Sequence, residues 1–457
     1  MRLVVLLLVT CSPALWAKTL QVSATVGPIR SIGEAIAQAA PGDTIRVESG
    51  VYQGNITLDR QVVVEGAGKP VIRGDGHGSV VTILANRCVM RGFVVEHSGS
   101  MLVDEDSGIL LKSSGNVVSE NELRDVLFGI YFFRASGNTV TGNVLRGRAW
   151  LEPGERGSGI HIWDSSGNTI LNNSISEMRD GMYLQNASGN FISGNRVHHL
   201  RYGLHYMFSD ENRFEANDFY DNVAGAAIMY SRHIQFRHNS FAHNRGFSSF
   251  GILFQDSRDC VAEDNTILDN AVGIFMETLT DSVFRRNIIS GNDIAVQAFS
   301  SAERDTFAQN NFIHNLSPFQ LIGKVTDIRW SETGKGNYWS AYDGYDMNGD
   351  HIGDVPFKIQ NLFEHLEANY PRLRLFLLSP ASQALAASER SFPVLEGPRT
   401  QDPVPLMRPL PLAVREPERR VHKGGVAAAL ALSTVMLAIS ATVILWGRSN
   451  GRSQRPD

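Results

Sequence analysis

Two successive stretches of 22 residues decide the fold: SGNTILNNSISEMRDGMYLQNA at 166–187 and SGNFISGNRVHHLRYGLHYMFS at 188–209. Each begins with Ser-Gly-Asn, carries a second Asn five residues after the first, and contains a Gly followed by alternating apolar residues. The same spacing recurs along the chain, mostly in 22-residue steps, with steps of 30 residues before Asn173 and 26 before Asn265. A repeat of this length is typical of a solenoid, in which each unit packs only on its neighbours.

The repeat forms columns of identical residues. The Asn columns are Asn116, Asn138, Asn168, Asn190 and Asn212, and, five positions later, Asn121, Asn143, Asn173, Asn195, Asn217, Asn239, Asn265 and Asn287. The Gly column is Gly108, Gly129, Gly159, Gly181, Gly203, Gly225, Gly251 and Gly273. The first and third positions after each Gly are almost all apolar, which predicts short strands with one face inward. We therefore predict an all-β parallel β-helix of ~22-residue coils, whose Asn residues form turns and stacked hydrogen bonds rather than ligand sites.

The two ends of the chain differ from the repeats. Residues 1–17 have the charged start, apolar run and small final residue of a signal peptide. The segment SIGEAIAQAA at 31–40 predicts a short amphipathic helix, followed by a turn and a strand at 44–47, which together would cap the first coil. The β-helix domain, with a cap at each end, is expected to span 18–375.

The C-terminal part is expected to tie this domain to a membrane. Residues 376–423 hold 8 of the 17 Pro, which predicts an extended linker. Residues 424–446 form a charge-free stretch long enough to cross a bilayer as one transmembrane helix. Because a cleavable leader would export the body, residues 447–457 are predicted to be a cytoplasmic tail.

Charge and cysteine content exclude some classes of protein. Residues 18–375 contain 31 basic and 41 acidic side chains, so nucleic acid is not an expected partner. Three Cys are too few for a disulfide scaffold, and no zinc-ligand spacing occurs. Removal of the leader would leave Cys88 and Cys260, which can pair only if the fold brings them together.

The outward positions of the predicted strands carry an unusual set of side chains. The second and fourth positions after each Gly include Tyr131, Phe133, His161, Trp163, Tyr183, His205, Met207 and Met229. Because the outer face of a soluble strand is ordinarily polar, this stripe indicates a contact surface for a ligand or a protein partner. We assign the partner face to Tyr131, Phe133, Trp163 and Tyr183. The alternative is that a loop covers the stripe, and the eight-residue insertion within 146–157 is placed to do so.

Methionine and histidine concentrate on the same face. Residues 161–243 hold 7 of the 13 His and 4 of the 11 Met. Met207 and Met229 lie one repeat apart in one column, with His205 beside them, and His161 lies on the same face. Thioether and imidazole ligands suit Cu(I) and suit Mg²⁺ or Ca²⁺ poorly, so these four residues are candidate ligands for transiently bound Cu(I). The alternative is that the methionines fill gaps and the histidines are ordinary surface residues.

Carboxylates are too sparse for polysaccharide chemistry, which needs acids that converge on one face. The only acid in the outward columns is Glu277, whereas Asp125, Asp164 and Asp180 fall at predicted coil corners. We predict no catalytic residues and a protein that is not an enzyme.

A possible calcium loop begins at Asp346 and contains Asn348, Asp350 and Asp354. Oxygen ligands at alternate positions suit Ca²⁺, but His351 stands where a calcium loop needs Gly. The alternative is a tight turn, rich in Asp and Asn, that closes the stack.

Three segments together resemble one family of exported proteins. These are SIGEAIAQAAPGDTIRVESGVYQGNI at 31–56, the SGN-x-x-x-x-N coils, and GNYWSAYDGYDMNGDHIGD at 336–354. They resemble the NosD family, over roughly residues 20–360. The resemblance implies a right-handed β-helix in the periplasm that helps to mature nitrous oxide reductase, and it supplies no ligand motif.

The resemblance also implies partners. They are the ATPase and permease subunits of an ABC transporter, a copper chaperone and the reductase, with copper or sulfur as cargo and an anchor in the inner membrane. The alternative function is a polysaccharide-binding or polysaccharide-processing β-helix that uses Tyr131, Phe133, Trp163 and Tyr183 as stacking platforms.

Overall fold

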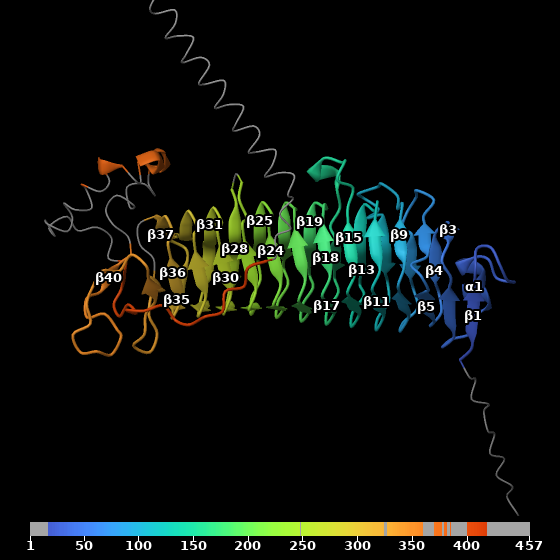
Figure 1. Cartoon of the computed structure of the whole chain (residues 1–457), viewed down its shortest axis with the longest axis horizontal. Helices are drawn as coiled ribbons and strands as arrows, with labels where there is room; N and C mark the ends of the chain where they lie inside the picture. The colour runs from blue at the N-terminus through green and yellow to red at the C-terminus, as the bar shows by residue number, and fades with distance from the viewer. Residues whose placement is uncertain are drawn as a thin grey trace, which may run out of the picture. The chain divides into compact units, whose positions relative to one another are not determined.

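The computed structural model describes residues 17–246, 248–323, 327–359, 370–376, 379–381, 384 and 400–417. Up to Glu416 the chain forms one compact unit. This unit is a right-handed parallel β-solenoid of about 14 turns (Figure 1). The repeat predicted the parallel β-helix, and the family resemblance implied its hand.

The coils stack three rows of parallel strands, which we call faces 1, 2 and 3. Face 1 contains β4 (Ile56–Leu58), β7 (Val81–Ile83), β10 (Ser107–Leu111), β13 (Phe128–Phe133), β16 (Ile160–Trp163), β19 (Asp180–Gln185), β22 (Tyr202–Met207), β25 (Ala224–Met229), β28 (Phe250–Arg258), β31 (Val272–Thr280), β34 (Ile294–Phe299) and β37 (Ser317–Ile322). Face 2 contains β1 (Thr19–Val22), β2 (Thr44–Val47), β5 (Val63–Gly66), β8 (Val89–Arg91), β11 (Val117–Ser119), β14 (Thr139–Thr141), β17 (Thr169–Leu171), β20 (Phe191–Ser193), β23 (Arg213–Glu215), β26 (Gln235–Arg237), β29 (Val261–Glu263), β32 (Val283–Arg285), β35 (Glu303–Ala308) and β38 (Asp327–Arg329). Face 3 contains β3 (Val51–Gln53), β6 (Val71–Arg73), β9 (Val94–Glu96), β12 (Glu122–Arg124), β15 (Val144–Arg146), β18 (Ser174–Ser176), β21 (Arg196–His198), β24 (Asp218–Tyr220), β27 (Ser240–Ala242), β30 (Thr266–Leu268), β33 (Ile288–Ser290), β36 (Asn311–Ile313) and β39 (Tyr338–Trp339).

The Asn columns form hydrogen-bonded ladders inside the turns, as predicted. Nδ2 of Asn173 donates to Oδ1 of Asn195 at 3.0 Å, and Nδ2 of Asn195 donates to Oδ1 of Asn217 at 2.9 Å. The same Oδ1 atoms also accept the backbone N–H of the Asn one coil earlier. The left-handed conformation falls on the residue before the Asn, for example Asn172 and Ala216, both with φ of 54°. The ladder Asn itself therefore satisfies backbone groups that face the coil interior.

The Gly column is required by close packing at the corner between faces 3 and 1. A Cβ atom on Gly181 would lie 2.2 Å from Cγ1 of Val197 and 2.6 Å from the carbonyl oxygen of Gly203. The interior of the coils is filled by stacked apolar residues, such as Phe214 on Phe236 with ring centroids 4.9 Å apart. Cys88 and Cys260 are buried as free thiols.

The N-terminal helix and strand form where the sequence predicted them. Helix α1 (Ile32–Gln38) begins after Ser31, whose Oγ accepts the N–H of Glu34, and it buries Ile32, Ala35 and Ile36. Strand β2 lies at Thr44–Val47, as expected. That this helix protects the first coil from edge pairing stays a prediction.

The segment 400–416, which we call the strap, runs back along face 3 from β39 toward β24 (red in Figure 1). The short sheet of β40 (Phe357–Lys358) and β41 (Gln401–Asp402) starts it. Leu410 exchanges two 2.9 Å hydrogen bonds with the side chain of Asn311, and Nε of Arg415 lies 2.6 Å from Oδ1 of Asp218. This part of the predicted linker is extended, and it packs on the solenoid.

Two 3₁₀ turns complete the described elements, η1 (Pro153–Glu155) and η2 (Pro371–Phe376). Within the described ranges, no helix is both long and apolar enough to cross a bilayer. The predicted span at 424–446 and tail at 447–457 lie outside those ranges, as does the predicted signal peptide apart from Ala17.

Candidate functional site

The predicted outward column on face 1 is a continuous ladder of rings. Strand pairing places Tyr131 beside His161, His161 beside Tyr183, and Tyr183 beside His205. The successive ring centroids are 4.7, 4.6 and 4.8 Å apart, each in an edge-on arrangement. The spacing follows from the ~4.8 Å separation of neighbouring strands. We call these four residues the ring ladder.

The start of the ring ladder is buried, which corrects the expectation of an exposed stripe there and agrees with the alternative of a covered one. Tyr131 is 3% exposed and His161 is 6% exposed, because Phe128 packs against both rings. Burial, and then a hydrogen bond with Glu105, raises the pKa of Tyr131 well above its ordinary value. Tyr183, like Phe133 and Trp163 of the predicted partner face, remains half-buried. Sequence periodicity could show that these side chains point outward but could not show what covers them.

His161 is a neutral imidazole without polar contacts. Neither ring nitrogen has a hydrogen-bond partner among the described residues. Burial lowers the pKa of His161 to about 3, so the ring carries no proton charge near neutral pH. A buried ring nitrogen without a partner is costly in a protein interior, which marks His161 as a group with available ligand capacity.

The other end of the ring ladder is polar and charged. Nδ1 of His205 lies 3.2 Å from Oδ2 of Asp180, whose side chain is fully buried. Arg201 forms two hydrogen bonds with the same carboxylate, at 2.9 and 2.7 Å. Burial alone would raise the pKa of Asp180, but the hydrogen bonds from His205 and Arg201 outweigh it and lower that pKa. Because Asp180 is an anion, Nδ1 of His205 is the donor in this contact, and Nε2 is the nitrogen left for a ligand.

The two methionines are neighbours on face 1, as predicted. Met207 and Met229 are directly paired neighbours on β22 and β25, and both are half-buried. His205 is two residues from Met207 on the same strand. His161 is two coils from His205, with the Tyr183 ring between them, so it is separate from the other three candidate ligands.

The donor types on face 1, thioether and imidazole, are those that a soft, monovalent metal ion prefers. No cluster of three His, Cys, Asp or Glu side chains suited to a metal occurs in the part of the chain that the structure describes. A centre on face 1 would therefore depend on the thioethers of Met207 and Met229, with Nε2 of His205 as third donor. Two sulfur ligands and one imidazole are a donor set that Cu(I) accepts.

Asp180 and Arg201 were missed as parts of the site by sequence reasoning, which placed Asp180 at a coil corner. Asp180 is the first residue of β19, directly before the Gly column, and its carboxylate reaches the residue one coil later. A sequence signal could have revealed this contact. Asp180 stands immediately before the column residue Gly181, and His205 stands two positions after Gly203 in the next repeat.

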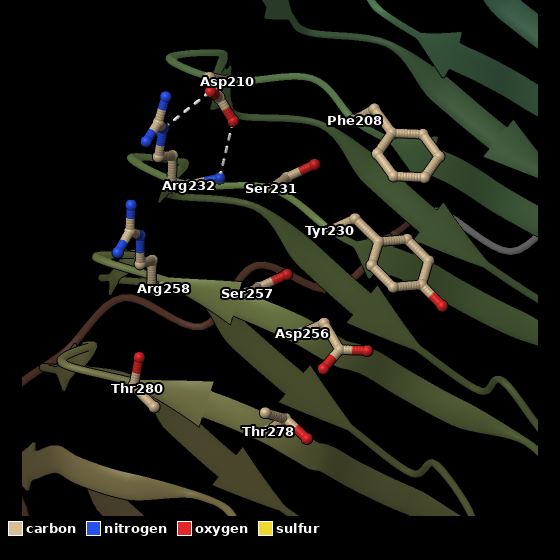
Figure 2. A pocket seen from close by; sticks show the side chains of 10 residues that line it. All are labelled: Phe208, Asp210, Tyr230, Ser231, Arg232, Asp256, Ser257, Arg258, Thr278 and Thr280. Carbon is tan, nitrogen blue, oxygen red and sulfur yellow. Dashed lines mark hydrogen bonds and ion pairs between the residues drawn. The ribbon is translucent and has the colours of Figure 1, made fainter.

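A cavity of about 570 Å³ opens where the chain leaves β22 and β25 (Figure 2). Phe208 and Tyr230, which follow Met207 and Met229 in the chain, stack with ring centroids 5.0 Å apart and form one wall. Arg232, paired to Asp210 at 2.9 Å, stands on the other wall. The cavity therefore has one aromatic wall and one charged wall.

The predicted calcium loop is a set of internal turns. Both carboxylate oxygens of Asp346 accept backbone N–H groups, from Gly349 and His351. Oδ2 of Asp350 accepts a hydrogen bond from Nδ2 of Asn348, and Oδ1 of Asn348 accepts the backbone N–H of Asp350. Oδ2 of Asp354 accepts the backbone N–H of Met347. The geometry agrees with the turn alternative, because these oxygens already have donors within the loop. Bound calcium stays a prediction.

The amino-acid sequence is similar to that of one family. Residues 146–344 match the family model described as "Periplasmic copper-binding protein (NosD)". A protein of Pseudomonas aeruginosa named "Probable ABC transporter binding protein NosD" is 36% identical over 420 residues, covering 86% of this chain and 97% of that protein. A protein of the same name from Stutzerimonas stutzeri is 34% identical over 380 residues, covering 79% of this chain and 86% of that protein.

Similarity to solved structures concerns the fold alone. The A-module of a mannuronan C-5 epimerase from Azotobacter vinelandii gives a TM-score of 0.51 at 15% identity, over 65% of this chain and 92% of that chain. The Dettilon tailspike protein gives a TM-score of 0.50 at 14% identity, over 70% of each chain.

Proposed function

Because this chain belongs to the NosD family of periplasmic copper-binding proteins, we propose that it is an accessory factor that carries Cu(I) for the maturation of nitrous oxide reductase. The protein acts in the periplasm, without catalytic residues of its own. The names of its relatives support an ABC transporter, with ATPase and permease subunits, as its partner. A copper chaperone would supply the ion, and a C-terminal span at 424–446 would anchor the protein in the inner membrane. Sulfur remains the alternative cargo.

The observation that carries the proposal is that His205 and the two methionines lie on the same outer face of two adjacent strands. Met207 and Met229 are in register on adjacent strands, and Asp180 fixes the ring of His205. In this arrangement the thioethers and Nε2 of His205 would hold Cu(I) as cargo, and the half-buried setting would keep it from water. Thioethers carry no charge, so a copper ion held there remains exchangeable by ligands of a partner.

The remaining candidates have supporting roles. His161 is too far along the ring ladder to share an ion with the methionines and offers a separate donor at its buried end. Phe133 and Trp163, which border the ring ladder, and Tyr183 within it form the surface against which a partner would rest.

The test is an anaerobic Cu(I) titration of the full-length protein against a chromogenic competitor. The Met207→Ala/Met229→Ala variant should lose one equivalent of tightly bound Cu(I). A matched control, Met347→Ala/Met407→Ala, removes two methionines elsewhere and should bind as the wild type does. Equal stoichiometry and affinity in both variants would remove the proposal.

A second candidate function rests on the same corner of face 1. Asp180, Arg201 and His205, with the ring of Tyr183 against His205, bring an anion, a cation and an imidazole together. Such a set could bind a uronate and abstract a proton from it, as in a polysaccharide-processing β-helix. The complete burial of Asp180 and the adjacent methionines favour copper. Product formation from polyuronates, followed by NMR and abolished by His205→Ala, would favour this second candidate instead.

A further inference from the structure

Two long loops interrupt the repeat at one corner of the solenoid. From β12 onward, most connections from face 3 to face 1 take three residues, as between β12 and β13 or between β18 and β19. In contrast, residues 97–106 connect β9 to β10, and residues 147–159 connect β15 to β16. Both loops project from the same edge, at the top of Figure 1. Insertions that leave a repeat protein on one side commonly form its binding surface. We call residues 98–106 and 147–157 the corner platform.

The corner platform exposes large apolar side chains that the solenoid core does not need. Val103 is 81% exposed, Trp150 is 70% exposed and Met101 is 56% exposed. Between the two loops lies a cavity of about 700 Å³, whose lining includes Met101, Leu102, Leu127, Trp150 and Glu155. A cavity bordered by an exposed Trp and Met is the form that an interface anchor site takes.

The loops are held in place by buried polar contacts. Arg148 is buried, and its guanidinium bonds Oδ1 of Asp125 at 2.9 Å, Oγ of Ser100 at 2.7 Å and the carbonyl of Ser98 at 2.6 Å. Asp106 accepts the N–H of Met101 at 2.9 Å. One arginine therefore joins the two loops to each other and to the solenoid. A surface ordered in advance loses less conformational entropy when a partner binds.

The charge around the apolar centre is negative. The two loops carry the carboxylates Asp104, Glu105, Asp106, Glu152 and Glu155 against only two arginines, Arg148 and Arg156. Arg148 is already paired with Asp125, and Arg156 donates to the carbonyls of Ala149 and Leu151 in its own loop. Excess negative charge disfavours a second copy of the same surface and an anionic membrane.

We propose that the corner platform docks a protein partner that presents an apolar projection surrounded by lysine and arginine. This proposal rests on the proposed function, because the partner would give or take the copper ion. The platform adjoins the buried end of the ring ladder, where Glu105 meets Tyr131 and Gly157 packs on Phe128. His205 lies three coils farther along face 1, ~14 Å at the usual strand spacing. A partner seated on the platform would therefore reach the copper ligands along face 1.

The test measures binding of the full-length protein to three purified probes in turn: nitrous oxide reductase, the copper chaperone and the transporter complex. For at least one probe, Trp150→Ser should raise Kd about tenfold or more, as expected for an anchor residue. Glu152→Lys/Glu155→Lys should lower the association rate and flatten its dependence on salt. The matched control, Val26→Ser/Leu84→Ser, removes exposed apolar side chains elsewhere and should leave Kd unchanged.

The outcome is separable from the copper proposal. The platform variants should keep the Cu(I) stoichiometry of the wild type, whereas Met207→Ala/Met229→Ala should keep partner affinity. The docking proposal is overturned if none of the three probes binds in a manner sensitive to Trp150→Ser. It is also overturned if the Glu152→Lys/Glu155→Lys variant binds with unchanged rate and salt dependence, or if vesicles containing anionic lipid compete for the platform.

Discussion

The imidazole of His205 is held by the fully buried carboxylate of Asp180 through a 3.2 Å contact at Nδ1, although the two residues come from successive repeats. This contact sets the direction of Nε2, which is the only nitrogen of His205 left for a ligand. Asp180 therefore contacts a proposed copper ligand without being a ligand itself. Substitutions of Asp180 should change the affinity for copper while all three proposed ligands remain.

Replacing Asp180 by Asn should therefore lower the affinity for Cu(I) by about 10- to 100-fold, the usual effect of losing a carboxylate that orients a histidine ligand. Competition titration under anaerobic conditions measures it. Asp164→Asn is the matched control, because Asp164 pairs with Arg134 at the surface and does not contact His205. An Asp180→Asn variant that folds and binds Cu(I) as tightly as the wild type would contradict this role.

His161 should make the protein less stable in acid. Its native pKa is about 3 because of burial, below the ordinary value of 6.5, so below pH 6.5 the unfolded chain binds a proton that the native protein does not. The free energy of unfolding contributed by this residue should fall by ~1.4 kcal/mol per pH unit as pH drops from about 6.5 toward 3. Chemical denaturation of His161→Phe should show a smaller loss over that range than the wild type. Identical pH profiles would contradict the prediction.

Asp305 should have the opposite effect. Its carboxylate is buried, only Oδ1 is hydrogen-bonded, to the N–H of Ser282, and burial raises its pKa to about 8. Between pH 4 and 8 the native protein keeps a proton that the unfolded chain has lost, so stability should decline as pH rises through this range. Asp305→Ser introduces serine, which is the residue at the equivalent position of the preceding coil, Ser282. This variant should be more stable than the wild type at pH 8, but not at pH 4. A wild type with no such decline would contradict the assignment.

The Asn ladder should be a major source of stability. Asn195 is fully buried and bonds Asn217, Asn173 and the carbonyl of Ile170. Asn195→Ala should lower the free energy of unfolding by about 1–3 kcal/mol or more, because several buried backbone groups lose their partners. Denaturant unfolding measures the loss. Asn186→Ala, at an exposed turn position, is the control and should have a smaller effect.

The strap should be released by one substitution. Nε of Arg415 donates to Oδ1 of Asp218 on β24 at 2.6 Å, near the end of the described chain. The backbone N–H of Arg415 donates to Oγ1 of Thr266 on β30 at 3.0 Å, and this bond does not need the side chain. Arg415→Ala should speed hydrogen exchange and proteolysis of residues 410–416 without changing exchange in the solenoid. Arg408→Ala, which removes an exposed arginine of the same segment, should leave both rates as they are. Equal protection in both variants would show that the ion pair does not hold the strap.

Much of the architecture was predictable, because each coil repeats the same local requirements. The Asn and Gly columns and the alternating apolar residues of 166–209 predicted strands, turns and register, and the structure confirms the pairing of Met207 with Met229. The columns did not predict that Phe128 packs on Tyr131 and His161, although the insertion within 146–157 indicated, as the alternative, that the stripe is covered. The contacts of Asp180 were missed for a related reason, because column analysis compares equivalent positions and these contacts join different columns.

The sequence by itself determined the parallel β-helix and the residues that share its outer face, because a period of two within strands and of 22 between coils leaves one way to bury the apolar side chains. Only the tertiary structure decided which of those residues are covered and which charges meet His205. It also decided that two insertions form one platform and that the strap returns along face 3. These features come from contacts between segments that do not occupy equivalent positions of the repeat. Their geometry therefore depends on the packing of the whole solenoid.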